Sequence, residues 1–477
     1  MPHQDTPAPG KPMPSMPTQD RSEDRPSILS PRYRATTIGM VSLVALIAFE
    51  ALAVATAMPT VAQALDGLSL YALAFGVTLA TSVIGMTVSG RWCDMHGPAS
   101  PLWTGLTCFL CGLMLAGFAV NMPMLLAGRL VQGLGAGGMS VALYVLVGRR
   151  YPEAMRPRLF AAFSAAWVVP SLVGPALSGL VVEHIGWRWV FLAVPPLALP
   201  AAALLRPALR ALPATPPCET ASRRRSLWAC GAAVGVCLLY LGGQQLGEQR
   251  HGASAVAMLV AAMALSLICT WRLLPRGTLS AARGLPSVIA LRGLVCAAFF
   301  GAEAFLPLLL SRERGLSPSM AGLALSAGAL GWSASSWYQG HSRNGWSRHR
   351  FLRVGTLGVC AGLALTVSAV WPSVPVSVAV LGWTVVGLGM GLTSASLSML
   401  TLSMSAPGQQ GANGSALQLC EAVTVAAAMA VGGSLFSALL ATSAQAAYLA
   451  NFAIAGAMAL LAAAIVGRIG ARQFVVN

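Results

Sequence analysis

Apolar stretches of about 20 residues follow one another along most of the chain, separated by short polar segments. A helix rises about 1.5 Å per residue, so each stretch is long enough to cross the hydrocarbon core of a bilayer. The pattern predicts an all-α polytopic membrane protein. We expect fourteen spans, at residues 36–58, 69–89, 101–120, 123–147, 158–182, 187–205, 227–246, 253–274, 287–310, 319–339, 351–371, 376–402, 413–438 and 447–467.

Two polar segments interrupt this succession. Residues 1–34 are rich in proline, serine and mixed charge and contain no apolar stretch, so we expect a disordered tail and no signal peptide. Residues 206–226 form a longer connection with several prolines and a run of three arginines. This connection is typical of a linker between two halves.

Composition agrees with a membrane protein. The chain is 56% hydrophobic and only 9% charged, whereas soluble domains carry about 25% charged residues. Its net charge of +16 could suggest nucleic acid, but no basic helix with interleaved aromatic residues occurs, so we expect no nucleic-acid partner. The arginines instead concentrate in alternate short loops, which indicates that both termini are cytoplasmic. An even number of spans follows, either fourteen or, if two stretches are misjudged, twelve.

The sequence offers little for catalysis or metal binding. Cys108 and Cys111 form a CxxC pair inside a span without a second pair, and the histidines lack metal-ligand spacing. No Ser/His arrangement or phosphate loop is present. We therefore expect no enzyme activity, no cofactor and no metal.

The most informative stretch is LLAGRLVQGLGAGG at 125–138, which places Arg129 inside a span, with Gln132 one turn further along. A guanidinium keeps its proton, so it must face a partner, a cavity or water. Gly133, Gly135 and Gly138, with Gly137, leave one side of the helix nearly bare, so a second helix can approach closely. The same glycines match a dinucleotide-binding fingerprint, but no strand precedes them, which argues against that interpretation.

Three acids lie at membrane depth: Glu50, Glu303 and Glu421. A charge there costs several kcal/mol unless it is paired or hydrated, so each is a functional candidate. Glu50 could instead form a fixed buried pair with Arg129, and Glu421 could make a static polar contact.

Four local motifs resemble the major facilitator superfamily, and within it the fourteen-span branch of drug:proton antiporters. The resemblance covers about residues 36–470. The motifs are an acid before a proline in span one (Glu50 and Pro59), the loop after span two (Gly90, Arg91, Asp94 and Gly97), the span-four motif (Arg129, Gln132 and Gly133) and the span-five antiporter signature (Gly174, Pro175 and Gly179). The loop lacks the basic residues that usually follow Gly97, and Ser178 replaces a glycine in the signature.

The resemblance implies the major facilitator fold, with two pseudo-symmetric six-helix halves and two extra spans between them. It implies a cytoplasmic tail at 1–34, a first half at 35–205, a linker at 206–226, two extra helices at 227–284, a second half at 285–470 and a short cytoplasmic tail at 471–477. Span nine, with Glu303, would then be the counterpart of span one, with Glu50.

The resemblance also implies a proton-coupled exporter of amphipathic small molecules or drugs, working by alternating access in the inner (plasma) membrane. Burial raises the pKa of a carboxylate and a nearby arginine lowers it, so helix movement can couple proton release to substrate exit. Glu50 or Glu303 would be the main coupling acid, with Glu421 as a further candidate and Arg129 as the modulator of Glu50. Phe299, Phe300, Trp332 and Trp383 could stack on a hydrophobic substrate, although such residues are more often packing residues.

Other functions stay open from sequence alone. An exporter of a native lipid or metabolite would use the same fold, and the span-five signature argues against an importer. A non-transporting sensor would not need three intramembrane acids. We expect a monomer whose partners are protons, the small amphipathic substrate and the lipid bilayer.

Overall fold

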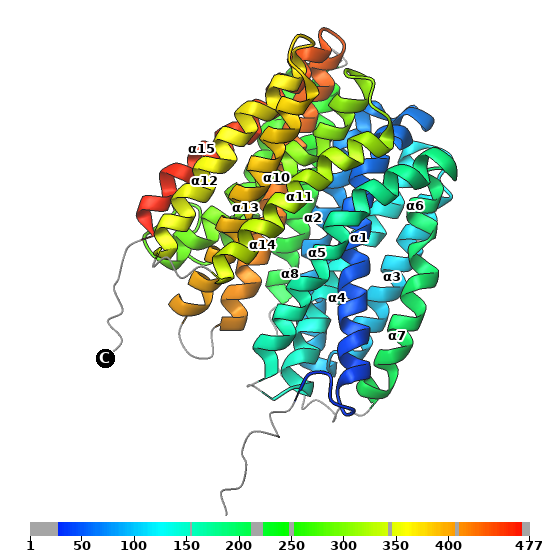
Figure 1. The fold of residues 1–477 in the computed structure, drawn as a ribbon, viewed down its shortest axis with the longest axis vertical. Coiled ribbons are helices and arrows are strands. Elements are labelled where there is room, and N and C mark those ends of the chain that lie inside the picture. Colours follow the sequence, from blue (N-terminus) through cyan, green and yellow to red (C-terminus); the bar gives the residue numbers. More distant parts are fainter. Residues whose placement is uncertain are drawn as a thin grey trace, which may run out of the picture.

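The computed structural model describes residues 27–152, 155–210, 223–247, 252–341, 346–405 and 410–469, and these are helical almost throughout (Figure 1). Eleven described stretches are long and apolar enough to cross a membrane, and two helices of the central hairpin carry shorter apolar segments. Each of the fourteen predicted spans overlaps a helix or, at 187–205, a pair of helices. The expectations for residues 1–26 and 470–477, and for most of the linker at 206–226, lie outside the described residues.

The first group of helices forms one bundle. Its elements are α1 (Arg34–Ala64), η1 (Leu68–Leu70), α2 (Tyr71–His96), α3 (Ala99–Gly117), α4 (Met122–Arg150), α5 (Arg156–His184), α6 (Arg188–Leu192) and α7 (Val194–Arg210). In this bundle α4 packs against α2 and α3, while α1 packs against α5 and α7.

The last group repeats this arrangement. Its elements are α10 (Leu285–Arg312), α11 (Pro318–His341), α12 (Arg348–Thr366), η3 (Val367–Val370), α13 (Val376–Met404), α14 (Gln410–Leu440), α15 (Ala444–Ile465) and η4 (Val466–Arg468). Here α13 packs against α11 and α12, while α10 packs against α14 and α15. The same pairing order in both bundles makes α1 the counterpart of α10, and α4 the counterpart of α13.

Two further helices join the bundles. The helices α8 (Arg223–Gly247) and α9 (Gly252–Leu273) pack on each other, and α8 also contacts α2 and α14. The bundles meet directly through α5 against α11 and α2 against α14. These two seams hold the halves together.

Side chains and glycine set several helix boundaries. Asn121 caps α4, because its Oδ1 accepts a 2.9 Å hydrogen bond from the Met124 N–H. Ser347 caps α12 and Ser443 caps α15 in the same way. At the other end of α2, Gly97 adopts φ +80°, a conformation that favours glycine, and so ends the helix at the predicted turn.

Candidate functional site

The buried centre of the first bundle is an ion pair between α4 and α1. Arg129 Nη1 lies 2.5 Å from Oε1 of Glu50, and both residues are almost fully buried, at 4% and 3% exposure. The same nitrogen donates to Oε1 of Gln132 at 2.7 Å, and Nε donates to the Ala74 carbonyl on α2 at 3.1 Å. The guanidinium therefore ties three helices together at a depth where an unpaired charge would be costly.

Glycines on α4 allow this close approach. A Cβ added at Gly133 would collide with Thr78 and Thr81 of α2, and one added at Gly135 would collide with the Phe109 backbone on α3. The predicted bare side of the helix thus serves two neighbours rather than one, because successive glycines face different helices.

Glu303 lies on α10 and differs from Glu50 in its surroundings. It is half-buried, and within the described residues it has no hydrogen bond or ion pair. The adjacent carbonyl of Ala304 accepts a 2.5 Å hydrogen bond from the Tyr71 hydroxyl of α2. Two residues before the acid, the buried Gly301 faces open space, because a Cβ added there would meet nothing within 4 Å. Glu303 therefore lies at a contact between the bundles.

Glu421 has a partner that sequence reasoning missed. Its Oε2 accepts a 2.8 Å hydrogen bond from Nε of Arg292, and the two side chains are 24% and 17% exposed. Arg292 lies seven residues into α10, inside an otherwise apolar span. The sequence did contain a signal for this ion pair, because an arginine inside an apolar span needs a partner; the same reasoning identified Arg129 as a site residue.

The four aromatic residues named as candidates for substrate stacking contact one another. The Phe299 ring stacks on Trp383 at 4.9 Å between centroids and meets Trp332 and Phe300 edge-on at 5.2 and 5.1 Å. Phe299 and Glu303 are four residues apart on α10, so they share a helix face. Trp383 is 1% exposed, so the cluster is packed together in this structure.

The predicted signature on α5 forms a seam between the bundles. A Cβ added at Gly179 would lie 2.5 Å from Cα of Ser319 on α11. In return, a Cβ added at Gly322 would meet the carbonyl oxygen of Pro175. The serine that replaces a signature glycine, Ser178, donates a 2.7 Å hydrogen bond to the Ala53 carbonyl on α1.

The remaining signature and loop residues are less tightly constrained. A Cβ added at Gly174 would make an ordinary contact with the Phe49 ring of α1, and one added at Gly90 would meet only the Val141 side chain. Arg91 lies near the end of α2, and its buried Nε has no hydrogen-bond partner among the described residues. The side chain of Asp94, predicted to meet a helix end or an arginine, lies outside the described part of the structure.

Metal binding finds no support among the described residues, where no group of three or more His, Cys, Asp or Glu side chains could hold an ion. What the described residues do provide is a set of carboxylates and arginines at membrane depth. Such groups can hold or move protons, or recognise a charged solute.

Comparison with known proteins agrees with this arrangement. Residues 39–429 match the sequence model of the Major Facilitator Superfamily. A Mycobacterium tuberculosis protein described as a probable multidrug-efflux transporter is 26% identical over 422 residues, which is 84% of this chain and 87% of that protein. The MFS transporter L2 of a Phoma species is 31% identical over 180 residues, covering 36% of this chain but only 30% of the relative.

Solved structures share the fold at low identity. A POT family transporter in complex with 5-aminolevulinic acid has a TM-score of 0.65 and 14% identity, covering 91% of this chain and 95% of that one. A bacterial homologue of the human lysosomal transporter Spinster, in an inward-facing and unoccupied conformation, also has a TM-score of 0.65 and 14% identity, over 92% of this chain and 96% of that one. The predicted fold class is thereby confirmed.

Proposed function

We propose that this chain, which belongs to the major facilitator superfamily, exports amphipathic small molecules in exchange for protons. Export is supported by the multidrug-efflux relative, whose match spans most of both chains. Proton exchange is supported by the carboxylates within the bundle, because a carboxyl group can gain or lose a proton as its surroundings change. The protein would work as a monomer in the inner membrane, with both termini in the cytoplasm.

The observation that carries the proposal is the different pairing of the three acids. Glu50 is held by Arg129 and Glu421 by Arg292, whereas Glu303 has no ion pair to a described residue. A carboxylate fixed beside an arginine keeps its charge, while an unpaired one at membrane depth can change it. We therefore assign the main coupling role to Glu303 and a structural role to the Glu50 pair.

The position of Glu303 supports its coupling to helix movement. Its neighbour Ala304 accepts the hydrogen bond from Tyr71, which crosses from the first half to the second. When the halves rock apart at this end, α2 withdraws and water can reach the acid. The acid would bind a proton from outside, carry it inward, and release it when substrate competes for the site.

A second candidate is export of a native metabolite. A relative in Aspergillus aculeatus, named as an Acurin A biosynthesis cluster transporter, is 31% identical over 161 residues, although the match covers only 29% of that protein. The same aromatic cluster and acid would serve such a solute, provided that it is amphipathic.

The test is substrate-stimulated proton movement in liposomes. Reconstituted protein is given an amphipathic cationic dye such as ethidium, and a trapped pH indicator reports proton flux. We expect dye movement and proton movement in opposite directions, both abolished when an ionophore collapses the pH gradient. Dye transport that is unaffected by the gradient would refute proton coupling, and movement of dye and protons in the same direction would refute antiport.

A further inference from the structure

A groove lies between the end of α2 and the start of α8, outside the residues used for transport. Its volume is about 490 Å³, and it is lined by Val88, Arg91, Trp92, Met95, His96, Leu227 and Cys230. Both helix ends belong to the side of the bundle where α4 ends at Arg150 and α9 ends near Arg272. The groove is therefore at the membrane surface that the loop charges predict to be cytoplasmic.

The polar part of the groove can bind an anion. Arg91 lines the groove with a permanently charged guanidinium, and its Nε has no hydrogen-bond partner among the described residues. His96, in the last turn of α2, is exposed and adds a ring N–H donor. A guanidinium fits the oxygens of a phosphate group, which it can bind through two parallel hydrogen bonds.

The rest of the groove lining is largely apolar. Leu227 is 62% exposed and Val88 is 44% exposed, and Met95 completes the apolar lining. On the neighbouring α9, the guanidinium of Arg272 lies over the rings of Trp228 and Trp271, at 5.4 and 5.1 Å. Tryptophan and arginine at this level are typical of the membrane interface.

We propose that this groove binds an anionic phospholipid of the adjacent leaflet. The lipid phosphate would accept hydrogen bonds from Arg91 and His96, while its acyl chains would lie along Leu227 and Val88. Basic pockets between membrane helices on the cytoplasmic side recognise anionic headgroups in this way. A free phosphate ion would use the donors but leave the apolar wall uncovered, so the lipid accounts for more of the site.

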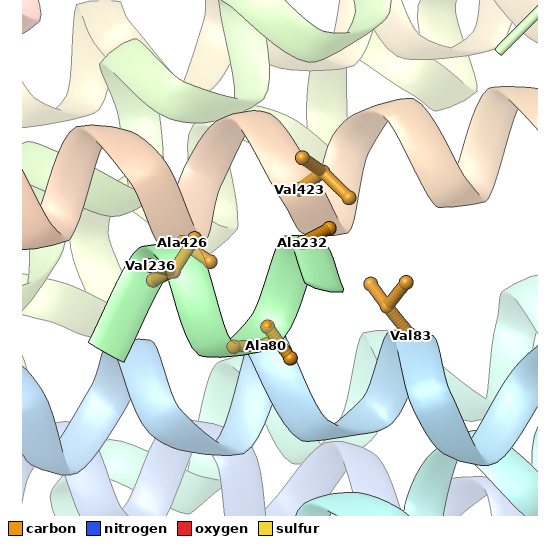
Figure 2. A pocket seen from close by; sticks show the side chains of 7 residues that line it. Ala80, Val83, Ala232, Val236, Val423 and Ala426 are labelled. Atoms are coloured by element: carbon orange, nitrogen blue, oxygen red, sulfur yellow. The ribbon is translucent and has the colours of Figure 1, made fainter. Parts of the chain in front are cut away.

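The position of α8 would allow the bound lipid to influence the movement of the two halves during transport. Figure 2 shows small side chains of α2, α8 and α14 meeting, among them Ala80, Ala232 and Ala426. Helix α8 thus packs on one helix from each half. A lipid seated between α2 and α8 would strengthen the attachment of α8 to the first half and so change how freely the halves separate.

The experiment measures lipid binding directly and does not depend on export. Delipidated full-length protein is titrated with phosphatidylglycerol, and in parallel with phosphatidylcholine of the same acyl chains, and bound lipid is counted by native mass spectrometry. We expect phosphatidylglycerol to bind more tightly, and Arg91→Gln to weaken it about tenfold through loss of charge-assisted hydrogen bonds. Arg353→Gln, an exposed arginine near the start of α12 in the other half, is the matched control and should bind as the native protein does.

Two further variants address the fold and the source of the phosphate. His96→Gln changes an exposed side chain, so it should weaken phosphatidylglycerol binding without lowering the melting temperature. Leu227→Gln should weaken phosphatidylglycerol binding, and excess inorganic phosphate should not displace the lipid. Equal binding of the two lipids, no effect of the Arg91 and His96 variants, or full displacement by phosphate would each overturn the proposal.

Discussion

The hydroxyl of Tyr71 donates a 2.5 Å hydrogen bond to the backbone carbonyl of Ala304, so α2 of the first half holds α10 of the second half beside Glu303. Tyr71 is fully buried, and its ring also contacts Phe305 at 5.6 Å between centroids. A second link at the same end joins the Glu183 carboxylate of α5 to the Ser319 N–H of α11 at 2.8 Å. The halves are therefore hydrogen-bonded at this end, next to the acid assigned to coupling.

We expect Tyr71→Phe to favour separation of the halves at this end, because one hydrogen bond between them is lost. The net value of such a bond is about 1 kcal/mol, which changes the ratio of two conformations about fivefold. Spin labels at Ile185 and Ala441, both exposed, would report the change as a longer distance by pulsed electron resonance on a cysteine-depleted background.

The matched control for this variant is Tyr151→Phe. The Tyr151 hydroxyl is hydrogen-bonded to Thr37 at 2.8 Å within the first half, so its removal costs a similar bond without crossing the seam. An identical distance distribution in both variants would show that the Tyr71 bond does not hold the halves together.

The Glu50–Arg129 pair should behave as a structural unit. Glu50→Gln leaves a buried guanidinium without its counter-charge, and we expect a loss of stability of about 3–5 kcal/mol. Adding Arg129→Gln should recover most of that loss, because no uncompensated charge remains. Thermal unfolding in detergent measures both effects.

Measuring transport by the Glu50→Gln, Arg129→Gln double variant distinguishes a structural role of the pair from a role in proton coupling. We expect the folded double variant to retain proton-coupled export, because Glu303 is intact. A stable double variant that no longer exports would return the coupling role to Glu50.

Much of the fold could be predicted from sequence. A helix that crosses lipid must be apolar along its length, so a hydropathy pattern locates the spans directly. The predicted span at 123–147 lies inside α4, which continues to Arg150, because helices extend beyond the apolar stretch into the interface. The predicted span at 187–205 is divided into α6 and α7 around Ala193, just before Pro195 and Pro196, which lack backbone donors.

The site was less predictable, because helix rotation decides which side chains meet. The sequence placed Glu50, Glu303 and Glu421 at membrane depth but left open which of them were paired. Arg292 lies within a long apolar stretch, and its contact with Glu421 joins residues 129 positions apart, so the sequence does not reveal the partner. Packing of whole helices sets such pairs, and local periodicity does not encode that packing.

Close packing on α4 should make Gly133 intolerant of a side chain. Gly133→Ala places a methyl group against Thr78 and Thr81 of α2, and we expect a loss of about 1–3 kcal/mol from overpacking. Gly148→Ala in the same helix meets nothing within 4 Å, so it should leave stability unchanged or raise it by up to about 1 kcal/mol. The melting temperature should therefore fall for Gly133→Ala and stay the same or rise for Gly148→Ala, and equal falls in both variants would contradict the packing argument.

Glu303→Gln should abolish export driven by a proton gradient, because glutamine keeps the size of the side chain but cannot bind or release the proton. Exchange of labelled for unlabelled substrate across liposomes without a gradient should persist, since it needs helix movement but no net proton transfer. Glu313→Gln is the control, because Glu313 is exposed at the end of the same helix and should transport as the native protein does. If Glu303→Gln exports at the native rate under a pH gradient, the coupling acid must be another group, and Glu421 beside Arg292 becomes the first to test.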